Sequence, residues 1–218
     1  MDNYNVSHIP KTTPNNRRPA HPLNATTITL HNTGNPKSTA RNERDWLTNS
    51  SNNRTASYHI VIDEHEAIEC LPLNENAWAA GDGASGPGNR ASIHIELCES
   101  GNYAKTLDNA VDLVAKLLRE RSWGVDRLRR HYDWTRKLCP RLMYDSGSWA
   151  GWQLFIKRVE DKLNDKGVHI KVNGELIKAR GELRDGVTWL PLRAVAEALG
   201  TEVSWESHHK TVHLTHLN

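Results

Sequence analysis

The most informative segment of the chain runs from His131 to Pro140 and reads His-Tyr-Asp-Trp-Thr-Arg-Lys-Leu-Cys-Pro. Its first residue is an imidazole and Cys139 supplies a thiol. A second imidazole, His31, stands far upstream at the end of the alternating run 26–30. Zinc accepts nitrogen and sulfur ligands tetrahedrally, and a catalytic zinc keeps one position for water. These residues are therefore a plausible catalytic zinc set, although isolated histidines and cysteines are more often structural.

Short runs outside this segment predict strands at residues 24–32, 58–62, 67–71 and 92–98. In the first run, Ile28 and Leu30 share one face and His31 lies on the other. In the last run, Glu96 lies opposite the apolar face. Residues 1–25 are rich in Pro, Asn and Arg and predict an irregular arm.

Amphipathic stripes predict helices at residues 39–49, 106–123 and 148–163. Strands and helices mixed in this order predict an α/β fold with a central mixed β-sheet flanked by helices. After residues 164–167 the composition changes, and this segment is the predicted linker. The chain is thus expected to hold a catalytic domain at 1–163 and a small α+β domain at 168–218.

Several segments resemble the type-2 N-acetylmuramoyl-L-alanine amidases, the zinc-dependent peptidoglycan amidases that include many phage endolysins. They are residues 30–35 (Leu-His-Asn-Thr-Gly-Asn), 76–78 (Asn-Ala-Trp) with 80–83 (Ala-Gly-Asp-Gly), and 131–140, with further agreement at 86–90 and 92–96. The resemblance covers residues 20 to 163. It implies the type-2 amidase fold and hydrolysis of the amide bond between N-acetylmuramic acid and L-alanine.

The resemblance also implies a cofactor and roles for individual residues. Zn²⁺ is expected to be held by His31, His131 and Cys139. Glu96 is expected to take a proton from the attacking water and deliver one to the leaving amine. The ammonium group of Lys137 is expected to stabilise the oxyanion.

Three positions need separate comment. Tyr58 is a further catalytic candidate, but alternation groups it with the apolar residues of its strand, so a core tyrosine is an equal alternative. Ala79 stands where many relatives carry a histidine that is not a zinc ligand, which puts a substrate contact in question. His94, at a position often held by glycine, is a candidate replacement for that imidazole.

The C-terminal segment carries its own signals. Asn173-Gly174 between two short runs predicts a hairpin, and Pro191 and Gly200 bracket a helix. Residues 185–200 resemble the module named after the copper amine oxidase N-terminal domain, which is common in surface proteins of Gram-positive bacteria. The name implies no copper chemistry. Four histidines lie near the end of the chain, and we expect them to be solvated polar residues rather than ligands of a second metal ion.

We expect this small domain to attach the enzyme to the cell wall. Aromatic and cationic side chains are the candidate contacts, namely Trp189, Trp205, Arg184 and Arg193. Stabilisation of the catalytic domain and dimerisation are the competing roles.

Composition excludes several classes of partner. The 218 residues carry a formal net charge of +2 with both signs interleaved, so nucleic acid is not indicated, and no apolar run has the length of a membrane span. Cys70 and Cys98 lie in apolar runs and are predicted to be buried hydrophobes rather than a disulfide. The N-terminal residues lack a basic start and an apolar core. This predicts synthesis in the cytosol without a signal peptide and action on the wall after phage or host lysis.

The sequence therefore predicts a zinc amidase whose substrate is bacterial peptidoglycan. A non-catalytic peptidoglycan-binding protein on the same fold is one alternative, favoured only by Ala79. A zinc peptidase that cuts stem peptides is another. The sequence leaves open whether the chain is a phage endolysin, a host autolysin or a sporulation enzyme.

Overall fold

A computed structural model describes residues 3–165 and 167–216 of the chain. The chain divides into two compact units, Met1–Leu163 and Asn164–Asn218, and each is described by itself. Lys166, in the segment predicted as the linker, lies outside the described residues, as do the two residues at each end of the chain.

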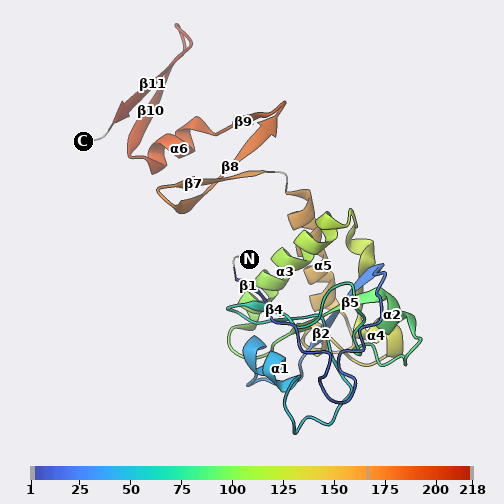
Figure 1. The fold of residues 1–218 in the computed structure, drawn as a ribbon. Helices are drawn as coiled ribbons and strands as arrows, with labels where there is room; N and C mark the ends of the chain where they lie inside the picture. Colours follow the sequence, from blue (N-terminus) through green and yellow to red (C-terminus); the bar gives the residue numbers. More distant parts are fainter. Residues whose placement is uncertain (1–2, 166, 217–218) are drawn as a thin grey trace. The chain divides into compact units, whose positions relative to one another are not determined.

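The first unit is built on a six-stranded mixed sheet with strand order β1-β4-β3-β5-β2-β6 (Figure 1). The strands are β1 (Tyr4–Val6), β2 (Thr27–Asn32), β3 (Ile60–Ile62), β4 (Ala67–Glu69), β5 (Ser92–Leu97) and β6 (Leu128–Arg130). Only the β3–β4 hairpin pairs antiparallel, and the other neighbours in the sheet are parallel. The mixed sheet with its flanking helices confirms the predicted α/β fold class.

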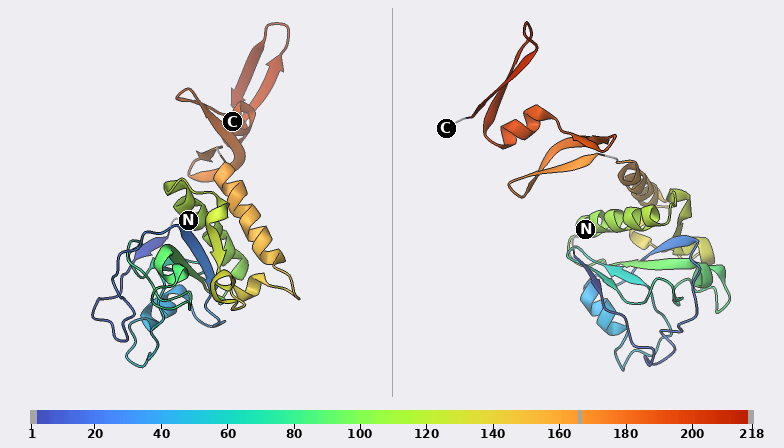
Figure 2. Two further views of the ribbon diagram at one scale, coloured as in Figure 1. Left: turned by 90° about the vertical axis from the view of Figure 1, so that its right-hand side faces the viewer. Right: turned by 45° about the horizontal axis from the view of Figure 1, so that its top comes forward.

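Helices cover both faces of this sheet (Figure 2). They are α1 (Ala40–Trp46), α2 (Pro87–Ala91), α3 (Tyr103–Glu120), α4 (His131–Thr135) and α5 (Ala150–Asn164), with short 3₁₀ turns at Val125–Arg127 and Arg141–Met143. The larger apolar core joins one face of the sheet to α3 and α5, through residues such as Ile28, Val114 and Phe155. A smaller core lies on the opposite face beneath α1 and includes Ala40 and Val61.

Tyr58 does not share a face with the residues that strand alternation assigned to it. It packs in the smaller core with Val61, whereas Ile60 and Ile62 belong to the larger core. The pairing is irregular just before β3, because the carbonyl oxygen of His59 accepts from the backbone N–H groups of two successive residues, at 2.7 and 3.3 Å. Tyr58 itself lies before β3, which begins at Ile60, and the chain bends at His59, so the alternation of the strand does not extend to Tyr58.

The N-terminal segment is more ordered than its composition predicted. Residues Tyr4–Val6 form β1, which pairs in parallel with β4 at the edge of the sheet. Three residues are too few to show an alternating pattern, so the prediction of an irregular arm was wrong there. Farther along, the fully buried guanidinium of Arg17 donates to the backbone carbonyls of Leu47, Asn52 and Arg54. Arg17 thus fixes the loop that follows α1.

We expect Arg17→Met to lower the free energy of unfolding by about 3 kcal/mol, because the buried Leu47 carbonyl and the partly buried Arg54 carbonyl lose a donor and the Asn52 carbonyl keeps only the Asn15 amide. Arg41→Met is the control, since the Arg41 side chain is half exposed and pairs with Glu66 at the surface. It should cost less than about 0.5 kcal/mol. Denaturant unfolding of both variants measures the difference, and equal stabilities would contradict the role of Arg17.

The described residues of the second unit form two small antiparallel sheets and one helix. Its elements are β7 (Val168–Val172), β8 (Glu175–Arg184), β9 (Val187–Trp189), α6 (Leu192–Ala198), β10 (Thr201–Glu206) and β11 (Thr211–His216). The β7–β8 hairpin turns at Asn173-Gly174, where both residues have positive φ, as the sequence predicted. Within the described part of the unit, Ile170 and Ala196 are its buried hydrophobic residues.

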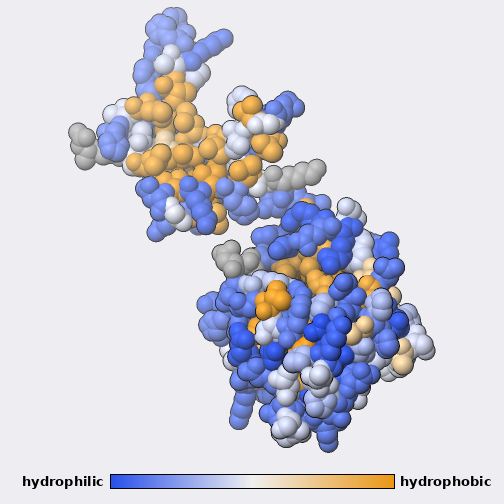
Figure 3. All heavy atoms as spheres, in the orientation of Figure 1, coloured by the Kyte–Doolittle hydropathy of each residue, from blue (hydrophilic) through white to orange (hydrophobic). Residues whose placement is uncertain are grey.

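Many of the larger apolar side chains of this unit are exposed, and the space-filling view shows them as a broad hydrophobic surface (Figure 3). Trp189 is 60% exposed and Trp205 57% exposed. Both aromatic rings are therefore accessible on this unit.

Two further expectations concern the whole chain. None of the described helices is long and apolar enough to cross a membrane. Cys70 and Cys98 are free and buried, which confirms that they serve as small core residues. Cys139 is also free and buried.

Candidate metal centre

The residues singled out by the sequence meet at one edge of the sheet. His31 and Glu96 are directly opposite each other in the parallel pair of β2 and β5, near the carboxyl ends of both strands. His131 begins α4 immediately after β6 ends. Because β5, β2 and β6 are parallel neighbours, their carboxyl ends meet at the same edge, which is where α/β sheets commonly hold ligands.

A tight loop returns Cys139 to the same edge. Helix α4 stops at Thr135, and Arg136 adopts a left-handed conformation with φ 64° that reverses the chain. The Tyr132 N–H then donates to the Cys139 carbonyl oxygen at 3.1 Å. The thiol sulfur accepts from the backbone N–H of Asn32 at 3.3 Å, which ties the loop to the end of β2.

Three donor atoms converge at this edge. One ligand atom each from His31, His131 and Cys139 lies within 4.8 Å of the others, and all three residues are buried. The two Nδ1 atoms are 3.0 Å apart, and Cys139 Sγ is 3.9 Å from His31 Nδ1. Two nitrogens held about 2.0 Å from a tetrahedral zinc would be roughly 3.3 Å apart, so the spacing fits that ion.

The hydrogen bonds of the two imidazoles also fit a cation. The ring of His131 hydrogen bonds to the Ala80 carbonyl, and its Nε2 faces the Ala80–Gly81 segment. His31 Nε2 contacts another buried ring, that of His94, at 3.0 Å. The Nε2 atoms of both rings are thus hydrogen bonded, so the lone pairs of the two Nδ1 atoms point toward each other and repel. A cation between them removes this repulsion.

Burial keeps the three groups uncharged in the metal-free protein. It lowers the pKa of His31 well below the ordinary value and that of His131 to about 4, and the positive charge of Lys137 acts in the same direction. Burial raises the pKa of the Cys139 thiol to about 12. Neutral imidazoles are the form that binds metals, while the thiol must lose its proton when a metal arrives.

Glu96 lies beside the donor cluster, the group formed by His31, His131 and Cys139, and one of its carboxylate oxygens has no hydrogen-bond partner among the described residues. That oxygen is the buried Oε2, and Oε1 is 4.0 Å from His31 Nδ1. Burial, reinforced by the nearby charge of Glu43, raises the pKa of Glu96 to about 8 against the opposing effect of Lys137. A carboxyl group with such a pKa can both accept and deliver a proton near neutral pH.

The other two predicted catalytic residues, Lys137 and Tyr58, also lie near the donor cluster, but Lys137 is exposed and Tyr58 is buried. Lys137 is exposed in the loop before Cys139, and its charge acts on His31, His131 and Glu96. The hydroxyl of Tyr58 donates to the Glu43 carbonyl oxygen at 2.8 Å. Tyr58 is therefore buried beside Glu96 with its proton engaged elsewhere.

Two surface pockets adjoin the cluster. A pocket of about 140 Å³ is lined by Glu96, Tyr58, Thr33, Glu43 and Arg54, among others. A wider one of about 450 Å³ is lined by residues that include Trp78, Gly81 and Asn89. Both are bordered by Ala56. Because Ala56 lines both pockets, the two pockets are neighbouring parts of one surface region beside Glu96.

The residues that shape the loop between β4 and β5 were not among those predicted from the sequence. Asn89 Oδ1 accepts from the backbone N–H groups of Ala79 and Ala80, at 2.9 and 2.8 Å. The Asp82 carboxylate accepts from the N–H of Gly88 at 2.6 Å and from that of Asn89 at 3.2 Å. Both residues stand in segments that match the amidase motifs, and this was the available signal. They hold the loop against His131 and α4.

Comparison with known proteins identifies the first unit. Residues 21–142 match the family described as N-acetylmuramoyl-L-alanine amidase, and residues 158–218 match that described as copper amine oxidase N-terminal domain. The catalytic domain of XlyA superposes with a TM-score of 0.65 at 36% identity, covering 72% of this chain and 99% of that one.

Two curated relatives from Bacillus subtilis (strain 168) differ in how much of their length is matched. N-acetylmuramoyl-L-alanine amidase XlyB is 44% identical over 131 residues, or 58% of this chain, which spans only 40% of XlyB. N-acetylmuramoyl-L-alanine amidase CwlH is 35% identical over 187 residues, which is 85% of this chain and 74% of CwlH. With its fold, motifs and converging side chains, the chain belongs to the N-acetylmuramoyl-L-alanine amidase family.

Proposed function

We propose that this chain is a zinc-dependent amidase that hydrolyses the amide bond between the lactyl group of N-acetylmuramic acid and L-alanine in peptidoglycan. The observation that carries the proposal is the convergence of His31 Nδ1, His131 Nδ1 and Cys139 Sγ beside the unpartnered oxygen of Glu96. Family membership supplies the substrate class, and the curated relatives named above are amidases of this kind.

In this proposal His31, His131 and Cys139 hold the ion. When bound, zinc supplies Lewis-acid chemistry, which polarises the scissile carbonyl and makes a water molecule more acidic. The backbone N–H of Asn32, which donates to Cys139 Sγ, favours the thiolate form that a metal needs. The loop 136–138 and the strand end at His31 hold these donors without help from substrate.

Glu96 moves the protons of the reaction. Its free Oε2 accepts the proton of the attacking water, and the same carboxyl later delivers a proton to the leaving amine of L-alanine. Lys137 lies on the exposed side of the cluster, where its ammonium stabilises the negative charge on the carbonyl oxygen in the transition state. Tyr58 lines the pocket, and we assign it no step, because its hydroxyl is bonded to Glu43.

Removal of the metal tests this proposal. Dialysis of the full chain against a chelator should abolish amide cleavage of a soluble muropeptide, and one equivalent of zinc should restore it. The same preparation distinguishes this amidase from the alternative function, a non-catalytic peptidoglycan-binding protein. The alanine at position 79 is the sequence feature that favours the alternative. Protein purified without chelator that holds no zinc and cleaves nothing would support that alternative.

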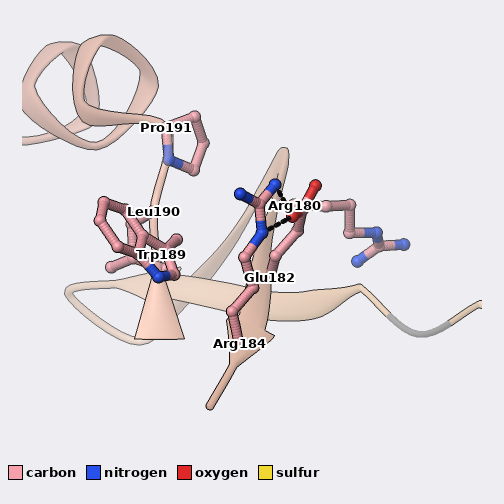
Figure 4. Close-up of a pocket in the computed structure, with 6 residues that line it drawn as sticks. All are labelled: Arg180, Glu182, Arg184, Trp189, Leu190 and Pro191. Atoms are coloured by element: carbon pink, nitrogen blue, oxygen red, sulfur yellow. Dashed lines mark hydrogen bonds and ion pairs between the residues drawn. The ribbon is translucent and has the colours of Figure 1, made fainter. Parts of the chain in front are cut away.

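We propose that the second unit attaches the enzyme to the cell wall and contributes no catalytic residue. Trp189, Leu190 and Pro191 form one side of a surface pocket, and Arg180, Glu182 and Arg184 line the rest (Figure 4). Arg184 is paired with Glu182. An exposed aromatic face next to charged planar groups suits contact with glycan and anionic polymer. Arg193 donates to the Val203 carbonyl oxygen, so we assign it a structural role.

A truncated chain ending at Lys166 should turn over soluble muropeptide at the rate of the full chain but sediment less with intact walls. The expectation follows because every proposed catalytic residue belongs to the first unit, and the XlyA catalytic domain folds without such an extension. Rates on muropeptide and the fraction sedimented with walls are the two measurements. Equal sedimentation of both proteins would rule out the attachment role.

A further inference from the structure

A third buried histidine stands directly behind the candidate ligand His31. His94 Nδ1 is 3.0 Å from His31 Nε2, and His94 Nε2 is 3.0 Å from the Gly88 carbonyl oxygen. The His94 side chain is 0% exposed. It cannot contact a substrate, so the expectation that it replaces the imidazole absent at Ala79 was wrong.

The positions of the ring protons follow from the last acceptor in this series. A carbonyl oxygen only accepts hydrogen bonds, so the proton of His94 is on Nε2. In a neutral imidazole the other nitrogen is then an acceptor, and His31 Nε2 must donate across the 3.0 Å contact. His31 Nδ1 is left with its lone pair, facing His131 and Cys139.

We propose that His94 is the positioning residue that holds His31 in the tautomer a metal requires, an inference that rests on the proposed zinc site. A histidine ligand commonly donates its outer N–H to a fixed acceptor, and that bond sets its tautomer, ring orientation and basicity. Here the acceptor is a second imidazole, itself oriented by the backbone of Gly88. His31 is thus prepared for the ion before the ion binds.

Buried groups surround His94, but only Gly88 and His31 contact its ring nitrogens among the described residues. The His94 backbone N–H donates to His59 Nδ1 at 2.9 Å, and His59 Nε2 donates to the Glu75 carbonyl oxygen at 2.8 Å. The two rings stack with centroids 5.8 Å apart and an interplanar angle of 15°. On the other side, a Cβ added at Gly88 would lie 2.4 Å from the Ala80 Cβ. The close packing at Gly88 leaves its carbonyl little freedom to move.

The register of strands β2 and β5 explains why His94 lies behind His31. His94 is paired with Thr29 in the β2–β5 ladder, two residues before the pair formed by His31 and Glu96. His94 and Glu96 therefore project from the same face of β5. One strand supplies both the carboxylate beside the metal ligands and the acceptor behind one of them.

Substitution at position 94 tests the inference by metal binding alone. Zinc affinity, measured by competition with a chromophoric chelator, should fall about 10- to 100-fold in His94→Leu. His94→Gln should recover most of it, because an amide can accept from His31 and donate to Gly88. His59→Leu is the control, since His59 is equally buried and touches only the backbone and ring face of His94. Wild-type affinity in His94→Leu, or an equal loss in His59→Leu, would overturn the proposal.

The unsubstituted full chain provides a second test that does not depend on the folding of variants. Histidine side-chain ¹⁵N resonances of the metal-free protein should show His31 and His94 both protonated on Nε2. An Nδ1-protonated His31 would overturn the inference. Neither measurement uses amide cleavage, so a protein with the expected tautomers and affinities that cleaves no muropeptide would contradict the proposed function alone.

Discussion

The Cys139→Ser protein is expected to bind zinc at least 100-fold more weakly than the wild type, a difference on the order of 3 kcal/mol or more. Amide cleavage at limiting zinc should fall with it. A serine hydroxyl stays protonated near neutral pH and cannot replace the thiolate, while its similar size leaves the loop 136–138 intact. Zinc content after gel filtration and turnover of soluble muropeptide are the two measurements.

Cys98→Ala serves as the matched control for this substitution. Cys98 is also buried and free, but it lies in the smaller apolar core away from the donor cluster. The control should keep one zinc per chain and lose only some stability. Full zinc content in Cys139→Ser would contradict the ligand assignment.

Glu96→Gln is expected to lower kcat by about 10²- to 10⁴-fold with little change in zinc content. Glutamine preserves the size of the side chain but cannot accept the proton of the attacking water. The loss should therefore be found in kcat rather than in metal binding. Turnover of soluble muropeptide by zinc-loaded protein measures it, and a variant with wild-type kcat would remove Glu96 from the mechanism.

The same substitution predicts a change in how stability depends on pH. In the metal-free protein the pKa of Glu96 is about 8, compared with an ordinary value of 4.5. Between these values the folded protein retains a proton that the unfolded chain has released, so the contribution of Glu96 to stability is lost as pH rises through this window. Glu96→Gln removes that loss, and each unit of pKa difference corresponds to about 1.4 kcal/mol.

Denaturant unfolding in the presence of chelator should show this difference directly. From pH 5 to pH 9, the stability of Glu96→Gln relative to the wild type should rise by a few kcal/mol. The comparison cancels the contribution of the buried histidines, whose lowered pKa values act in the opposite sense as the pH falls. A difference that stays constant across this range would contradict the burial of an uncharged Glu96.

Regular periodicity made much of the fold predictable. The stripe at 106–123 corresponds to α3, and the alternation at 92–98 corresponds to β5 with its apolar residues in the larger core. The position of Glu96 opposite that core also followed from alternation. These features depend only on neighbours along the chain, so a single sequence displays them.

Features that depend on contacts between distant segments were not predictable. Strand β1 has three residues and exists because β4 offers an edge for pairing. Tyr58 was assigned to the wrong face because the bend at His59, which ends the strand pattern before Tyr58, cannot be seen in the sequence. The contact of His94 with His31 joins residues 63 positions apart and requires the register of β2 and β5.

Mass spectrometry of the products released from purified peptidoglycan identifies the bond that is cleaved. We expect stem peptides with a free L-alanine amino terminus, together with glycan strands whose lactyl groups end in a carboxylate. Formation of these products should be slowed about 10²- to 10⁴-fold in Glu96→Gln. Peptides cut within the stem, with L-alanine still attached to muramic acid, would instead identify a zinc peptidase and contradict the proposed amidase function.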